Sequence, residues 1–312
     1  MKKLVTIERS LLIGHIASMV FGLAGLLWVL PHAEFILDLS PFGQKAFTWS
    51  MANGGVSYML LGTAAIAIYA YRQLGTKPWL TFMIPAIAIS LSSELLGTST
   101  GFPFGHYRYL SGLGYKIADL VPFTIPLSWF YLGFAAYLLA RSGLSGLAVP
   151  NGLRLLGAIV FGSILLTSWD FILDPAMSQT SIPFWVWEQP GAFFGMPYQN
   201  FVGWLGTGAV FMTVATLFWD KRPIALSRSQ LIFPLTVYLA NLGFALVMSA
   251  SSGFWIPATL GILTGAIPAI AFFSMAKSQA QIANEEREAN SDRPFIVTEV
   301  QLTSNKDPLT VK

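Results

Sequence analysis

The stretch WDFILDPAMSQTSIPFWVWEQPGAFFGMPYQNFVGW, residues 169–204, is unlike the rest of this chain of 312 residues. It contains ten aromatic residues, no Lys or Arg, and three acids: Asp170, Asp174 and Glu188. Breaks at Pro190-Gly191 and Met196-Pro197 argue against one continuous helix through this stretch. It therefore predicts the end of a helix, followed by an ordered aromatic loop that folds back over a cavity.

The composition around this stretch is that of a membrane protein. Hydrophobic residues make up 54% of the chain and charged residues 11%, and the mean hydropathy is +0.61. Soluble globular domains carry about 25% charged residues. A polytopic membrane protein is therefore favoured over the alternative, a large soluble helical core.

Seven or eight apolar runs have the length of about 20 residues that a hydrocarbon core about 30 Å thick requires. They cover residues 11–30, 47–70, 79–96, 120–140, 153–173, 201–219, 231–249 and 254–275. The first run resembles a signal peptide, but it is long enough to span and no clear cleavage site follows it. The sequence predicts an all-α polytopic bundle with the aromatic loop between spans five and six.

Basic residues concentrate in alternate loops. With eight spans, one side has only Lys45, Arg108 and Lys116, while the other collects the N-terminal lysines, the remaining basic loops and the tail. The positive-inside rule then places both termini in the cytoplasm. Residues 1–276 form the predicted transmembrane domain, and the polar segment 277–312 is expected to be a disordered cytoplasmic tail.

Several classes of chemistry lack the residues they need. The chain has no Cys, which excludes disulfides, iron–sulfur clusters and thiol catalysis. Its three His, at positions 15, 32 and 106, are too few for a membrane di-iron site. No strand followed by a dinucleotide-binding glycine motif occurs, and the charge pattern does not suggest nucleic acid. The sequence thus favours non-redox chemistry.

Acids on separate spans converge at one membrane face. Glu94 lies near the end of the third run and Asp170 near the end of the fifth, and both runs point outward. A charged acid at the centre of a membrane helix costs roughly 2.5–3.5 kcal/mol, so such acids usually face a cavity. The alternative is that each acid braces a helix end. Asp174 shares a helix face with Asp170 if the helix persists, but Pro175 favours a helix end at Asp174.

Other polar residues are open to two interpretations. His106, within a polar patch after GFPFG, is either a structural hydrogen-bonding residue or a catalyst. Glu188 either joins the site or faces water. Asn53 lies near the same face. Asp119 is predicted to cap the fourth span, and Asn241 to make an interhelical hydrogen bond.

These parts suit acid–base chemistry through a carbocation. One carboxyl kept neutral by apolar surroundings would donate a proton to an alkene. A second carboxylate would orient and deprotonate water, and aromatic faces would stabilise the cation between the two steps.

Three segments carry a resemblance to a known family. SSELLGTSTGFPFGHYRY (residues 92–109), WDFILDPAM (169–177) and WVWEQPGAFFGMPYQNFVGW (185–204) resemble the signature segments of the carotenoid hydratases. That family includes γ-carotene 1′-hydratases of cyanobacterial type and archaeal bisanhydrobacterioruberin hydratases. The resemblance implies cofactor-independent addition of water to the terminal double bond of an acyclic ψ-end group, as in γ-carotene or lycopene. The product would be a tertiary 1′-hydroxy carotenoid, on a route to myxol-like compounds in the cyanobacterial type.

The resemblance carries over six motif positions: Glu94, His106, Tyr107, Asp170, Asp174 and Glu188. The roles of the site residues are our own inference. We expect Asp170 to donate the proton and Glu94 to orient water, with the reverse assignment left open; Asp174, Glu188 and His106 complete the catalytic set. The expected substrate-binding residues are Tyr107, Tyr109, Trp169, Trp185, Trp187, Phe194, Tyr198 and Asn53. The expected partners are a lipophilic carotenoid, water, membrane lipid and other enzymes of the carotenoid pathway.

Two rival functions belong to other classes. Asp170 and Asp174 have the spacing to hold Mg²⁺ and a diphosphate, as in a prenyltransferase resembling the UbiA type, although no second Asp-rich motif occurs. Alternatively, the protein is a proton-coupled transporter or binds carotenoid without transforming it, and the acids serve as a relay or counter-charge.

Overall fold

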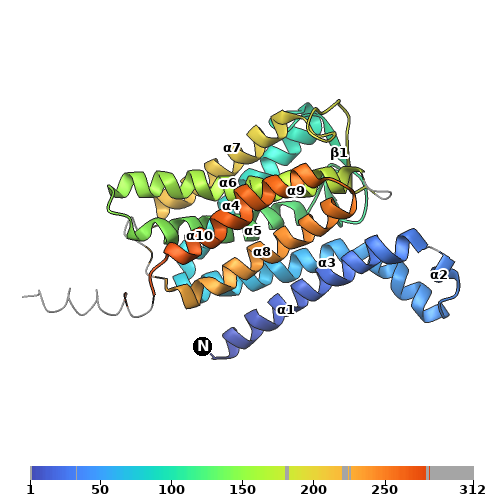
Figure 1. The fold of residues 1–312 in the computed structure, drawn as a ribbon, viewed down its shortest axis with the longest axis horizontal. Helices are drawn as coiled ribbons and strands as arrows, with labels where there is room; N and C mark the ends of the chain where they lie inside the picture. Colours follow the sequence, from blue (N-terminus) through green and yellow to red (C-terminus); the bar gives the residue numbers. More distant parts are fainter. Residues whose placement is uncertain are drawn as a thin grey trace, which may run out of the picture.

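The structure is a computed structural model that describes residues 2–32, 34–179, 183–219, 224, 226–278 and 281. Its helices lie side by side in one elongated bundle (Figure 1). They are α1 (Lys2–Ala24), α2 (Glu34–Leu37), α3 (Pro41–Leu74), α4 (Thr76–Thr100), α5 (Thr124–Gly143), α6 (Asn151–Gln179), α7 (Tyr198–Phe218), α8 (Arg228–Ser251), α9 (Trp255–Gly261) and α10 (Ile267–Met275). Turns of π-helix follow α1 at Gly25–Val29 and join α9 to α10 at Ile262–Ala266; short 3₁₀ turns lie at Leu30–His32 and Leu144–Gly146.

Seven helical segments among the described residues are long and apolar enough to span a membrane. These are the segment from α1 to His32, the helices α3, α4, α6, α7 and α8, and the segment from α9 to α10. Helix α5 lies among these helices (Figure 1) and is not one of the seven candidate spans. The predicted all-α polytopic membrane bundle of seven or eight spans is confirmed.

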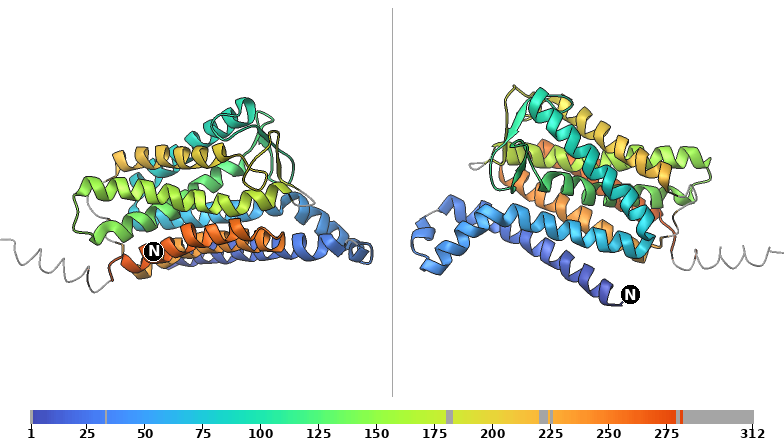
Figure 2. Two further views of the ribbon diagram at one scale, coloured as in Figure 1. Left: turned by 45° about the horizontal axis from the view of Figure 1, so that its top comes forward. Right: turned by 180° about the vertical axis from the view of Figure 1, so that it is seen from behind.

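The core of the bundle is built around α5. All but one residue of this helix is buried, and α3, α4, α6, α7, α8 and α10 all pack against it. Helix α1 instead lies at the outer edge of the bundle beside α3 (Figures 1 and 2). A central helix shielded from lipid can carry polar ring atoms, because neighbouring helices supply their hydrogen-bond partners.

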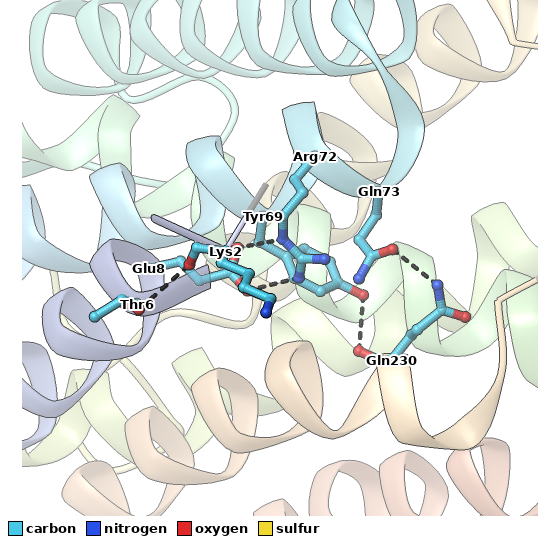
Figure 3. Close-up of polar contacts among 7 residues, drawn as sticks. All are labelled: Lys2, Thr6, Glu8, Tyr69, Arg72, Gln73 and Gln230. Atoms are coloured by element: carbon cyan, nitrogen blue, oxygen red, sulfur yellow. Dashed lines mark hydrogen bonds and ion pairs between the residues drawn. The ribbon is translucent and has the colours of Figure 1, made fainter. Parts of the chain in front are cut away.

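One end of the bundle is fastened by polar contacts (Figure 3). Arg72 near the end of α3 binds Glu8 of α1, with Nη2 to Oε1 at 2.6 Å and Nε to Oε2 at 2.9 Å. The Tyr69 hydroxyl donates to the backbone oxygen of Gln230 at the start of α8, at 2.9 Å. The Gln230 side chain also contacts that of Gln73 at 2.8 Å. These contacts join three helices at this end.

The start of α1 and the end of α10 lie at this same end, since Arg228 at the start of α8 also donates to the Ala276 carbonyl at 2.7 Å. The placement of both termini in the cytoplasm stays a prediction from the charge pattern. The predicted disorder of 277–312 concerns residues that, apart from Lys277, Ser278 and Gln281, lie outside the described part of the chain.

A small β-ribbon joins two loops at the opposite end. Strand β1 (Tyr107–Tyr109) pairs antiparallel with β4 (Trp185–Trp187), so Tyr107 faces Trp187 and Tyr109 faces Trp185. Strands β2 (Lys116–Ile117) and β3 (Val121–Pro122) form a second short pair. Side chains alternate along a strand, so β1 buries both tyrosines and exposes Arg108 between them. The ribbon ties the loop after α4 to the loop after α6.

Two local predictions are wrong. Helix α6 does not end at Asp174 but continues through Pro175 to Gln179. Membrane helices tolerate proline more readily than soluble ones. Pro175 has no N–H to donate to the Phe171 carbonyl one turn earlier, and Ser249 of α8 donates to the adjacent Ile172 carbonyl.

Asp119 does not cap the fourth span. It sits in the turn between β2 and β3 with φ of 59°, and α5 begins five residues later at Thr124. Asp is one of the few residues that adopt this left-handed backbone conformation readily. The turn, rather than the start of α5, therefore accounts for an Asp at position 119.

Candidate functional site

Glu94 is buried near the end of α4 and accepts three hydrogen bonds. Its Oε2 accepts from the hydroxyls of Tyr107 and Tyr109, the latter at 2.9 Å, and its Oε1 accepts from the Trp129 indole N–H at 3.0 Å. A carboxylate offers about four acceptor sites. Glu94 therefore has three of these occupied and about one left for a ligand or water.

The two tyrosines that hold Glu94 remain protonated donors. Burial, and then the neighbouring charge of Glu94, raise the pKa of the Tyr107 hydroxyl well above its usual value. The same two causes raise the pKa of Tyr109. Both phenols lie on β1, so the spacing of two residues within one strand aims them at one carboxyl.

Asp174 is buried on α6 and is held by two indoles. Its Oδ1 accepts from the Trp185 Nε1–H, and its Oδ2 accepts from the Trp187 Nε1–H at 3.1 Å. Both indoles come from strand β4, again two residues apart on one face. An indole nitrogen only donates. The two indoles therefore favour the ionised form of Asp174, in which both carboxylate oxygens accept hydrogen bonds.

Asp170 lies one helical turn before Asp174 and has fewer partners. Its Oδ2 accepts from the Asn200 amide at 2.7 Å. Among the residues that the structure describes, Oδ1 has no hydrogen-bond partner, although the side chain is buried and lines the cavity. Asp170 is thus the carboxyl with an oxygen available to a ligand.

Tryptophan rings connect the acids. Trp129, which binds Glu94, stacks on Trp204 of α7 with ring centroids 3.9 Å apart. Trp204 meets Trp169, next to Asp170 in sequence, edge to face at 5.8 Å. Negative ring faces attract a cation, and the effect grows when water is excluded. Trp169 and Trp204 both line the cavity and are therefore suited to stabilising positive charge there.

All three carboxyls open onto one cavity with a volume of about 200 Å³. Its walls come from α1, α3, α4, α5, α6, α7, α8 and the β1–β4 ribbon. No Lys or Arg is among the described residues that line it. The cavity combines three acids with aromatic and aliphatic walls, which suits proton transfer to an apolar molecule.

Eight of the residues expected from the sequence line this cavity: Glu94, Tyr107, Tyr109, Trp169, Asp170, Asp174, Trp185 and Trp187. They come from α4, α6 and the ribbon, and the ribbon is the element that brings the two loops together. Their individual roles stay predictions.

Five other expected residues lie away from the cavity. His106 is exposed, and Glu188 makes an exposed ion pair with Arg108 at 3.0 Å. Phe194 packs against Phe193 and Phe254, Tyr198 is exposed, and Asn53 donates to the Trp49 carbonyl of its own helix at 3.1 Å. The structure thus separates these five from the three buried acids.

The sequence did not single out three residues of the site. Trp129, Asn200 and Trp204 hold or connect the acids. Asn200 carried a weak signal, as an amide at the start of a span next to the acidic stretch. Trp204 carried none, because tryptophan near a span boundary is commonly an interfacial anchor. Trp129 carried none either, because it lies in the middle of the apolar run 120–140 with no acid near it in sequence.

Comparison with known proteins identifies the family. A family described as carotenoid biosynthesis protein matches residues 54–268. This chain belongs to the carotenoid biosynthesis protein family. The match includes every acid, tyrosine and tryptophan of the site, and the family membership expected from the sequence motifs is confirmed.

One curated protein is similar to the chain along most of its length. The bisanhydrobacterioruberin hydratase of Haloarcula japonica is 32% identical over 253 residues, which cover 80% of each chain. No solved structure matches the chain significantly. The family membership and the apolar helices together establish a multi-pass membrane protein of carotenoid biosynthesis.

Proposed function

We propose that this protein hydrates the terminal double bond of an acyclic ψ-end group of a carotenoid such as γ-carotene or lycopene, and forms a tertiary 1′-alcohol. The observation that supports this most directly is one aromatic cavity with three carboxyls whose hydrogen-bond partners are unequal. The family membership supports the substrate class, and the name of the archaeal relative supports the reaction.

Asp170 is the proton donor in this mechanism. A neutral carboxyl with a free oxygen can protonate the CH carbon of the terminal double bond, so that the π bond breaks and a tertiary cation remains. Asp170 Oδ1 is the carboxyl oxygen without a partner among the described residues. Three negative charges in one small cavity repel each other, which favours a proton on the acid that has the fewest donors.

Glu94 is the base that accepts a proton as water attacks the cation. A tyrosine hydroxyl both donates and accepts, so Tyr107 and Tyr109 can reorient when Glu94 becomes protonated. The indoles around Asp174 only donate, and a proton on Asp174 would disrupt them. Asp174 therefore stays a carboxylate that stabilises the cation.

The steps balance without a cofactor. The alkene gains a proton from Asp170, and the cation gains the water oxygen. One water proton stays in the new hydroxyl group, and the other goes to Glu94 and then to Asp170, replacing the proton that the alkene took. The faces of Trp169 and Trp204 stabilise the intermediate cation.

The prenyltransferase alternative fits these contacts less well. Both Asp174 oxygens accept indole N–H groups where Mg²⁺ would need free ligands. The described residues of the cavity wall supply no Lys or Arg for a diphosphate. Activity that persists in EDTA with an undecorated carotenoid and water would exclude this alternative.

The deciding experiment uses purified protein reconstituted in liposomes with lycopene, in water labelled with heavy oxygen. We expect a product heavier by one water, with the label in its hydroxyl group. Bound lycopene that is never converted would instead establish a binding or transport protein. A hydroxyl oxygen derived from O₂ would indicate an oxygenase, and either result would overturn the proposal.

A further inference from the structure

Part of the cavity is lined by α1, its π turn and α3, and we call this part the arm. This arm lies between the C-terminal half of α1, with its π turn, and the N-terminal half of α3. We call these the outer halves of the two helices. Among the lining residues of the arm are Phe21, Gly22, Gly25, Leu26, Phe47 and Met51. Among the lining residues that the structure describes on α1 and α3, two serines and Tyr58 are polar and none is charged. An uncharged arm of this kind suits a long apolar ligand rather than water or an ion.

The arm opens on a surface that faces lipid. Phe21 lines the cavity and yet exposes 65% of its surface, so the cavity reaches the outside beside α1. Val20 and Trp28 on the same helical segment are 60% and 69% exposed. This part of α1 lies within the candidate span Lys2–His32. The opening therefore faces sideways, on a helical segment that is long and apolar enough to cross the bilayer.

The inner half of α1 is closed by tight polar packing. The Glu8–Arg72 pair fastens its first turns to α3 (Figure 3). Further along, His15 Nδ1 bonds the Tyr58 carbonyl at 2.7 Å and Nε2 bonds the Asn241 amide at 2.9 Å. The His15 ring also packs on Gly62, where an added Cβ would come within 2.8 Å of it. The free space between the two helices is thus confined to their outer halves.

We propose that this arm binds the conjugated polyene body of the substrate, which enters sideways from the bilayer with its acyclic end group directed to the acids. This inference rests on the proposed function and adds the binding site and route for the rest of the molecule. A conjugated chain is a stiff apolar rod, and its solvent is the bilayer. A lateral opening that continues to the acids lets the end group reach them without bringing the polyene into water.

Two glycines line the arm on α1 and its π turn. Gly22 and Gly25 are three residues apart, on one face of the helical segment, and both line the cavity. A Cβ added at either position would meet no atom within 4 Å. Gly55 of α3 differs, because a Cβ there would come within 2.6 Å of the Gly112 carbonyl. A larger side chain at Gly22 or Gly25 therefore fits the fold and occupies the space of the substrate.

The test measures binding separately from chemistry. The Asp170→Asn variant, alone and combined with Gly25→Leu or Gly22→Leu, is purified from cells that accumulate lycopene, and bound lycopene per protein is read from absorbance. We expect the combined variants to hold about tenfold less lycopene, because overfilling a formed site commonly costs about one factor of ten or more. Gly243→Leu on α8 is the matched control, because a Cβ added there also meets no atom within 4 Å and Gly243 does not line the cavity. The Asp170→Asn variant that also carries Gly243→Leu should keep its bound lycopene.

The outcomes separate this inference from the proposed reaction. Lycopene that is absent from the Asp170→Asn parent, or retained fully by Gly25→Leu, would overturn the polyene arm. Lycopene whose binding depends on Gly25, in a protein that forms no hydrated product, would support the arm and refute the hydratase. Normal hydration by a protein carrying Gly25→Leu would support the hydratase and refute the arm.

Discussion

Tyr107 and Trp187 face each other across the β1–β4 ribbon, with ring centroids 5.3 Å apart, and each donates a hydrogen bond to a different acid. Tyr107 binds Glu94 of α4, and Trp187 binds Asp174 of α6. One ribbon of three residue pairs thus positions carboxyls from two helices. The loops after α4 and α6 therefore act as a single structural unit. A substitution that displaces one loop should also displace the acid held by the other.

Replacing Asp170 with Asn should abolish hydration while the protein still accumulates in the membrane. The amide keeps the size of the side chain but cannot donate an acidic proton, and loss of a general acid commonly lowers rates by about 10²–10⁴-fold. Product is measured by mass analysis in lycopene liposomes. Asp119→Asn is the control, because Asp119 lies exposed in a turn outside the cavity. Full turnover by Asp170→Asn would rule out the donor assignment.

Glu94→Gln should also abolish hydration, whereas Tyr109→Phe should only weaken it. Glutamine cannot accept the proton of the attacking water. The phenylalanine leaves Glu94 two donors, Tyr107 and Trp129, and loss of one hydrogen bond to a charged group costs about 1.5–3 kcal/mol. Hydration rates of both variants, each compared with wild type, test this order. A Tyr109→Phe variant as inactive as Glu94→Gln would indicate that the phenol itself takes part in proton transfer.

Much of this site was predictable because span length and direction follow from hydropathy. Counting spans predicts that Glu94 and Asp170 lie at the same membrane face, and the structure brings both to one cavity. The ribbon was not predictable, because strands of three residues carry almost no periodic signal and their pairing joins loops far apart in sequence.

Helix boundaries and burial depended on distant neighbours. Pro175 argued for a helix end, and the structure continues α6 past it beside Ser249 of α8. Helix α5 looked like one span among eight, yet it forms the centre of the bundle. Hydropathy distinguishes a membrane helix from a loop, but it does not say which helix is surrounded by the others. The role of Trp129 followed from that central position.

Alkaline pH should destabilise the protein through the two phenols that bind Glu94. Burial and the charge of Glu94 raise the pKa of Tyr107 and Tyr109 above the usual value of about 10. The folded state then holds these protons more tightly than the unfolded state. Stability from this source is complete below about pH 10, and it is lost as pH rises further towards the folded pKa.

The measurement is thermal unfolding of detergent-solubilised protein at rising pH. The double variant Tyr107→Phe/Tyr109→Phe should be less stable at neutral pH but should lose less stability on the alkaline side than wild type. Wild type and double variant with parallel losses on the alkaline side would contradict the raised pKa of these two phenols.

Trp185→Phe should destabilise the ribbon end of the bundle. The change removes one of the two indole donors of Asp174 and leaves a buried oxygen without its partner, which costs about 1–3 kcal/mol. Trp49→Phe is the control, since Trp49 is 62% exposed and substitutions at such positions usually stay within about 0.5 kcal/mol. Thermal unfolding in detergent compares the two. Equal melting temperatures for both variants would show that the Trp185 contact contributes nothing to stability.

Removing one member of the Glu8–Arg72 ion pair should destabilise the protein, whereas removing both together should leave its stability nearly unchanged. Glu8→Gln leaves the mostly buried Arg72 guanidinium without its charge partner, and breaking a buried ion pair costs about 3–5 kcal/mol. Replacing both residues with Met removes the two charges together, and such exchanges are often neutral or stabilising. Thermal unfolding of the single and double variants should therefore rank Glu8→Gln lowest, with Glu8→Met/Arg72→Met near wild type. A double variant as unstable as the single would mean that the pair contributes more than it costs to bury, and that α1 depends on it for its position beside the polyene arm.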